Sequence, residues 1–125
     1  NYDCIQFNEV LEGSYTIEVD VTGANNAGIL WNAQDGNNSN ALWLSPNNVR
    51  VFGGGTWYNQ QLAAWGASYN WQSTIKVKIE VDGTKVTVFV NDAKIGEATV
   101  GASSGRVGFF SLNQAASFDN FQVTR

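Results

Sequence analysis

A regular alternation of apolar and polar residues runs through most of this chain and restricts the fold it can adopt. In residues 15–21 the odd positions are apolar and the even positions are polar, and residues 74–81 repeat the pattern. A period of two fits a strand, because successive side chains of a strand point to opposite faces of the sheet. Both segments are therefore predicted to be strands with one buried and one solvated face.

Further segments have the composition of strands and are separated by turn residues such as Asp82-Gly83 and Asn91-Asp92. They are residues 28–34, 41–45, 48–52, 85–90, 95–100, 106–112 and 117–124. Residues 60–66 could form one helical turn, although the flanking glycines and aromatics argue against it. About eight or nine short strands without a helix predict an all-β fold, an antiparallel two-sheet β-sandwich or jelly roll. We expect residues 1–125 to form a single domain.

The charge balance excludes several classes of partner. The chain has a net charge of −4 and no His. A negative protein is repelled by polyanions, so neither nucleic acid nor an acidic membrane surface is an expected partner. No apolar stretch approaches the roughly 20 residues of a membrane helix. The absence of His excludes a Ser-His triad and a His-ligated metal site.

The single cysteine and the first residue bear on the setting of the domain. Cys4 has no second cysteine to pair with, so we expect it to be buried as a small apolar side chain or paired outside this sequence. The chain opens at Asn1 without an initiator Met or a leader. We therefore expect a monomeric module of a larger protein that is secreted or lies at the cell surface.

Several segments, taken in order, resemble the concanavalin A-like and laminin-G-like β-sandwich domains. They are residues 12–19 (EGSYTIEV), 27–35 (AGILWNAQD), 71–83 (Trp, an alternating strand, then Asp-Gly), 105–109 (GRVGF) and 118–123 (FDNFQV). This superfamily includes carbohydrate-binding modules of bacterial polysaccharide-degrading enzymes, lectins and glucanases, so the resemblance implies the fold and leaves the function open. Asn32 stands where many relatives have an Arg that helps to hold the ligand, so their specificity is not carried over.

One pair of acids suggests catalysis. Glu18 and Asp20 lie on the same polar face of a predicted strand and resemble part of the Glu-x-Asp-x-x-Glu signature of β-glucanases. Glycoside hydrolysis needs two carboxylates that flank the bond, one of them a proton donor. Gly23 occupies the position of the final Glu, so the acid is missing. We interpret the pair as part of a solvated strand face and predict that the domain is not an enzyme.

The supply of aromatic and amide side chains points to sugar binding. Five Trp and fifteen Asn occur in 125 residues. Sugar rings stack on flat aromatics, and their hydroxyls pair with planar amide or guanidinium groups. Alternation places Trp43 and Arg50 opposite to their apolar neighbours, and we expect Asn32 and Gln34 to share one sheet face with them. Trp31 is in phase with Ile29 and is predicted to lie in the core.

A second group of aromatics lies in a Gly-rich segment that begins at residues 53–55. It contains Trp57, Tyr58, Trp65 and Tyr69, mixed with Asn and Gln. The segment is too polar to be a buried strand, so some of these rings should cover a sheet edge. One or two are expected to lie exposed over the binding face.

The resemblance also implies a structural calcium ion, since jelly-roll sugar modules often carry one that joins the two ends of the chain. Glu9 and Asp119 are the candidate ligands, because calcium prefers oxygen donors. No cofactor is required by the predicted function.

The sequence therefore predicts a non-catalytic carbohydrate-binding module that docks a neutral poly- or oligosaccharide. Its role would be to hold an attached enzyme or a cell against the glycan. The alternative is a protein-binding or spacer domain of an extracellular surface protein or adhesin, which would need an apolar patch of a few hundred Å².

Overall fold

The computed structural model describes residues 2–35, 38–53, 59–101, 103–112 and 115–125, and this part of the chain forms β-strands without an α-helix. The strands are β1 (Tyr2–Gln6), β2 (Leu11–Glu12), β3 (Ser14–Thr22), β4 (Ala27–Ala33), β5 (Asn40–Ser45), β6 (Asn48–Phe52), β7 (Gln61–Gly66), β8 (Thr74–Asp82), β9 (Lys85–Val90), β10 (Ala93–Thr99), β11 (Ser104–Leu112) and β12 (Ser117–Thr124). Among the described residues, no helix has the length and apolarity to span a membrane.

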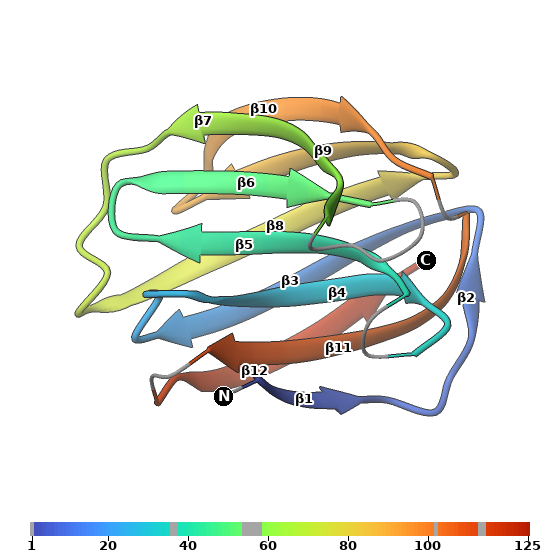
Figure 1. The fold of residues 1–125 in the computed structure, drawn as a ribbon, viewed down its shortest axis with the longest axis horizontal. Coiled ribbons are helices and arrows are strands. Elements are labelled where there is room, and N and C mark those ends of the chain that lie inside the picture. Colours follow the sequence, from blue (N-terminus) through green and yellow to red (C-terminus); the bar gives the residue numbers. More distant parts are fainter. Residues whose placement is uncertain (1, 36–37, 54–58, 102, 113–114) are drawn as a thin grey trace.

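The strands form two antiparallel sheets, one in front of the other in Figure 1. The larger sheet has the order β1-β11-β4-β5-β6-β7, and the short β2 pairs with β11. The smaller sheet has the order β10-β9-β8-β3-β12. The predicted all-β, antiparallel two-sheet β-sandwich is confirmed.

The core lies between the sheets and is built from the alternation in the sequence. In β3 and β8 the odd-numbered residues are buried, and the two strands pair residue for residue, so that Ile17 lies beside Ile79. Trp31 of β4 is fully buried in the same core, as predicted. The outward residues of β3 and β8 are mostly Thr, Glu, Asp and Lys, which gives the smaller sheet a solvated outer face.

Aromatic side chains fill both edges of the sandwich. At one edge β7 lies beside β10 (Figure 1), and Trp65 packs against Gly96, where an added Cβ would lie only 2.6 Å from indole atoms. At the opposite edge, between β11 and β12, the rings of Phe109 and Phe118 stack with their centroids 4.4 Å apart. Both edges are therefore extensions of the hydrophobic core.

The segment at residues 60–66, which the sequence left open between a helical turn and irregular structure, is the strand β7. Its inward residues, Ala63 and Trp65, are partly buried against the core, and its other residues are exposed. An edge strand of this kind buries few side chains. The alternation is correspondingly weak in the sequence.

The expectation that Cys4 is buried is wrong, because this residue is exposed. It lies on β1, the outermost strand of the larger sheet, opposite Phe110 of β11. An edge strand has a neighbour on one side alone, so a small side chain on it keeps contact with solvent.

Candidate functional site

Trp43 and Arg50 form a pair on the outer face of the larger sheet. They lie directly opposite each other on β5 and β6, on the face away from the core residues Leu42 and Val51. The guanidinium carbon of Arg50 lies 4.3 Å from the centroid of the Trp43 ring, within the range of a cation–π contact. Both side chains are half-buried. The predicted neighbourhood of these two residues is confirmed.

The pair lies on a second hydrophobic cluster, which occupies the outer face of the same sheet. The cluster comprises Leu30, Ala33, Ala41, Phe52 and Phe110, with Trp43 and Leu112 packed against it. The Trp43 ring contacts Phe52 at a centroid distance of 5.5 Å and Phe110 at 6.3 Å. A rigid aromatic floor of this kind holds the indole in one orientation.

Asn26 fixes the polar edge of the indole. Its Oδ1 accepts a hydrogen bond from Trp43 Nε1 at 3.0 Å and another from Ser45 Oγ at 3.3 Å. Asn26 has a left-handed backbone (φ 59°), which Asn tolerates better than most residues, and its own N–H donates to the Leu44 carbonyl. Asn26 was not predicted from the sequence, because its contact with Trp43 depends on which strand lies beside β5.

Positive charge marks this face. Strands β4, β5, β6, β7 and β11 contain no charged residue other than Arg50 and Arg106. Both arginines alternate with core-facing residues and so lie on the outer face. Within the described part of the chain, no carboxylate forms an ion pair with Arg50, and its buried Nε has no hydrogen-bond partner.

Asn32 does not join this face, and the expectation that it does is wrong. It is fully buried, and its Oδ1 accepts a hydrogen bond from Tyr15 Oη in the core at 2.5 Å. The reason is a β-bulge: β4 has one extra residue against β11 between Leu30 and Ala33, and Asn32 has a positive φ of 51°. The bulge breaks the alternation, so Trp31 and Asn32 both face inward.

Gln34 is also separate from the Trp43–Arg50 pair. It follows the end of β4, is exposed, and donates from Nε2 to the Ser104 carbonyl at 2.9 Å. The residue of β4 opposite Trp43 is Gly28, which places Gln34 about 15–20 Å farther along the strand. The predicted set of four on one face therefore reduces to Trp43 and Arg50.

The described aromatic residues that follow β6, Trp65 and Tyr69, make contacts that support the fold. Trp65 faces the core side of β7, and Tyr69 donates hydrogen bonds to the backbone carbonyls of Ser45 and Asn48, the latter at 3.1 Å. Tyr69 thereby stabilises the β5–β6 hairpin, which carries Trp43 and Arg50. Trp57 and Tyr58 lie outside the described residues.

The half-buried phenol of Tyr69 predicts a loss of stability at alkaline pH. Burial raises the pKa of Tyr69 to about 12, although its hydrogen bonds to Asn48 and Ser45 lower the pKa in part. The unfolded chain loses this proton near pH 10.0, so between pH 10 and 12 the folded state binds more protons than the unfolded state. The stabilisation is complete below pH 10 and is lost as the pH rises through about 12. Urea unfolding as a function of pH should show this fall, with a smaller slope in Tyr69→Phe; an unchanged slope would contradict it.

The two candidate calcium ligands, Glu9 and Asp119, each have another partner. Glu9 forms an ion pair with Arg125, just beyond the end of β12, whereas Asp119 lies near the start of that strand and accepts a hydrogen bond from the Asn120 N–H. Calcium takes six to eight oxygen ligands. Among the described residues, no three His, Cys, Asp or Glu side chains lie close enough to hold a metal ion.

The acids that resemble a glucanase signature lie on the opposite side of the molecule. Glu18 and Asp20 face outward from β3, and each stands across from a lysine of β8, Lys78 and Lys76 respectively. Asp20 also accepts a hydrogen bond from Asn120 Nδ2 at 2.8 Å. These contacts are those of a solvated strand face with mixed charge.

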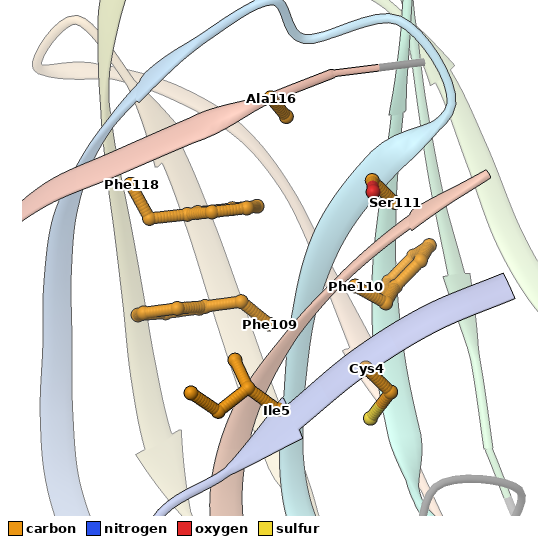
Figure 2. Close-up of a pocket in the computed structure, with 7 residues that line it drawn as sticks. All are labelled: Cys4, Ile5, Phe109, Phe110, Ser111, Ala116 and Phe118. Atoms are coloured by element: carbon orange, nitrogen blue, oxygen red, sulfur yellow. The ribbon is translucent and has the colours of Figure 1, made fainter. Parts of the chain in front are cut away.

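A hollow of about 250 Å³ lies at the edge formed by β1, β11 and β12. Figure 2 shows the parallel rings of Phe109 and Phe118 on one side of it, near Ile5, with Cys4 and Phe110 on the other. Ile5 is 58% exposed, which is unusual for a residue of its size. This hollow has no charged side chain among its lining residues.

Two antiparallel sheets that pack face to face define the fold as an all-β sandwich. The fold is similar to that of the carbohydrate-binding module CBM66 from Bacillus subtilis, with a TM-score of 0.86 and 17% sequence identity. The superposition covers 99% of this chain and 82% of the CBM66 chain. A putative glycosyl hydrolase from Parabacteroides distasonis (TM-score 0.72, 12% identity, 98% of this chain and 83% of that one) and sheep galectin-11 in complex with glycerol (TM-score 0.67, 12% identity, 98% and 96%) have the same fold. No protein-family model and no curated protein sequence matches the chain. At these identities the similarity establishes the fold alone.

Proposed function

We propose that this domain is a non-catalytic carbohydrate-binding module that docks a poly- or oligosaccharide on the outer face of its larger sheet. The observation that carries the proposal is the Trp43–Arg50 pair, held half-buried by an aromatic floor and by Asn26. Indole carbon and guanidinium donors are the two kinds of surface that a sugar needs, one for its C–H face and one for its hydroxyls. The likeness to a carbohydrate-binding module and to a galectin supports the same proposal.

The pair is pre-organised for binding. The indole has contacts with Phe52, Phe110 and Asn26, so binding a ligand costs little side-chain entropy there. Sugar hydroxyls must give up water for each hydrogen bond they make, which limits the gain. We expect Kd values from micromolar to millimolar for a single site.

The proposal is tested by a screen of poly- and oligosaccharides with intrinsic Trp fluorescence as the readout. Trp43→Ala should weaken binding at least tenfold, because it removes the stacking surface and releases Arg50. Phe89→Ala is a matched control, since Phe89 also faces outward with a cation, Lys78, above its ring at 4.4 Å, but on the smaller sheet. Its affinity should equal that of the wild type. A wild-type protein that binds no glycan, or equal losses in both variants, would refute the proposal.

Two arms of the same screen address the metal and catalysis. Binding is expected to persist in chelator, because Glu9 is paired with Arg125 and, among the described residues, no three His, Cys, Asp or Glu side chains lie close enough to hold a metal ion. Incubation with a bound glycan should release no reducing ends, because Glu18 and Asp20 lie on the sheet opposite to the proposed site. We further propose that the domain acts outside the cell as a monomeric part of a longer protein.

A protein-binding role is the second candidate function, and it rests on the hollow at the β1 edge. Ile5 is exposed beside the stacked rings of Phe109 and Phe118, which gives this edge an apolar contact surface. Ile5→Ser should leave glycan binding unchanged if the two surfaces are independent. A glycan screen without a response would favour this second role.

A further inference from the structure

We infer that the glycan bound at the Trp43–Arg50 face carries an anionic group, a carboxylate or a sulfate, which the guanidinium of Arg50 holds. This inference rests on the proposed function and names the class of its ligand. It departs from the neutral glycan predicted from the net charge of −4. Net charge describes the whole molecule, whereas a ligand meets the field of the face on which it binds.

The two outer faces of the sandwich differ in charge. On the smaller sheet, acids and lysines alternate across the strands, as in the rows Asp20–Lys76 and Glu18–Lys78. On the larger sheet, β4, β5, β6, β7 and β11 carry Arg50 and Arg106 and no acid, and the acids of this sheet, Asp3 and Glu12, lie on β1 and β2 beside β11. An acidic protein thus presents a positive face over the very strands that carry the aromatic pair.

A comparison within the molecule isolates what is unusual about Arg50. Lys78 also stands opposite an aromatic ring on the neighbouring strand, with its Nζ 4.4 Å from the Phe89 centroid. Lys78, however, has Glu80 at 3.7 Å and faces Glu18 on β3. Arg50 has the same kind of aromatic contact, but no carboxylate of the described residues forms an ion pair with it. An anionic ligand would give the half-buried Arg50 the counter-charge that Lys78 already has from Glu80 and Glu18.

The geometry of Arg50 suits a two-oxygen acceptor. The guanidinium carbon of Arg50 lies over the Trp43 ring, and the N–H donors of a guanidinium lie in its own plane. Its Nε is buried and has no hydrogen-bond partner, so this cation is not fully satisfied by the protein. Carboxylates and sulfates present paired oxygens that match this fork, and such charge-assisted bonds are stronger than those to hydroxyls.

Arg106 extends the same field. It lies on β11, three strands from β6 in the order of the sheet, a lateral separation of about 14 Å, and it pairs with Ala33, which places it about 15 Å farther along the strands than the row of Gly28, Trp43 and Arg50. No ion pair joins Arg106 to another described residue. A glycan chain that crosses the strands from β6 to β11 would therefore meet a second cation, and we expect polymers with repeated anionic groups to bind more tightly than single residues.

The test uses glycan pairs that differ in charge alone. Polygalacturonate is compared with its fully methyl-esterified form, and a sulfated galactan with its desulfated form, so that carboxylate and sulfate are distinguished. At least one anionic member should bind about tenfold more tightly than its neutral partner, and that preference should shrink as NaCl is raised. Arg50→Gln should abolish the preference, whereas the matched control Lys78→Gln should retain it.

The outcomes separate this inference from the proposed function. If the neutral and anionic members bind equally, the inference is overturned and the carbohydrate-binding function stands. If no member of either pair and no other glycan binds, both fall together. Should Arg50→Gln fail to fold, Arg50→Lys keeps the charge without the fork, and it should retain the salt dependence with a several-fold lower affinity for the anionic glycan.

Discussion

Gly28→Ala is expected to destabilise the domain by about 3 kcal/mol or more and to abolish glycan binding at the same time. Gly28 lies on β4 between Trp43 of β5 and Phe110 of β11, in one row across the larger sheet. A Cβ at this position would collide with the Leu42 carbonyl oxygen and would lie 2.9 Å from Cε1 of Phe110. A backbone carbonyl cannot rotate away as a side chain can, so β4 and β5 would have to separate.

The same substitution is expected to disturb the Trp43–Arg50 pair, because Gly28 lies in one row with Trp43 and Phe110. The approach of the Trp43 and Phe110 rings over Gly28 depends on the absence of a side chain there. A displaced β5 would move Trp43 away from Arg50 on β6 and from its hydrogen bond to Asn26. Stability and binding are therefore expected to fall together, although the variant adds a single methyl group.

Thermal unfolding and the fluorescence titration check this prediction. The expected change in Tm is a fall of roughly 10 °C or more for a domain of this size. Gly66→Ala is the matched control, because Gly66 also lies in a strand of the larger sheet and an added Cβ would meet nothing within 4 Å. That variant should keep wild-type stability and affinity. A stable Gly28→Ala protein that binds normally would show that the row is not rigid.

The sequence predicts the fold best where the alternation is regular. β6 (Asn48–Phe52) and β9 (Lys85–Val90) begin and end where the composition predicts, because each has buried residues at every second position and turn residues beside it. The edge strands β1 and β7 bury few side chains, and the short β2 offers little pattern. Periodicity measures burial and is therefore weak in such strands, although β12 (Ser117–Thr124), which also buries little, was predicted with its observed bounds.

The candidate site was predicted in part, and the failures have local physical causes. Trp43 and Arg50 were found together because regular strands keep their side chains on one face. Asn32 was misplaced because a bulge adds one residue to β4 and turns that side chain inward. Asn26 was overlooked because its contact with Trp43 arises from the pairing of β4 with β5, which no local pattern encodes. Register and bulges are tertiary properties, and polar positions depend on them more than core positions do.

Gly105→Ala should disrupt that bulge and is expected to destabilise the protein by about 3 kcal/mol or more. Gly105 has a φ of 145°, in the region that favours glycine, and it precedes Arg106 of β11, which pairs with Ala33. An added Cβ would collide with the carbonyl carbon of Asn32 and would lie 2.6 Å from the backbone nitrogen and oxygen of Ala33. The extra residue of β4 is thus accommodated because β11 has no side chain at that point.

The loss should be traceable to the buried hydrogen bond that the bulge creates. If β11 moves away, Asn32 loses its inward position and Tyr15 Oη loses its acceptor in the core, where an unsatisfied hydroxyl costs about 1–3 kcal/mol. Gly13→Ala separates the two contributions, since Gly13 has a positive φ of 74° but nothing within 4 Å of an added Cβ. It should cost about 1 kcal/mol, from backbone conformation alone. Urea unfolding of both variants, and of each combined with Tyr15→Phe, measures the difference. If Gly105→Ala costs no more than Gly13→Ala, or if the effects of Gly105→Ala and Tyr15→Phe simply add, then the bulge does not depend on Gly105 and Asn32 is held inward by its own backbone.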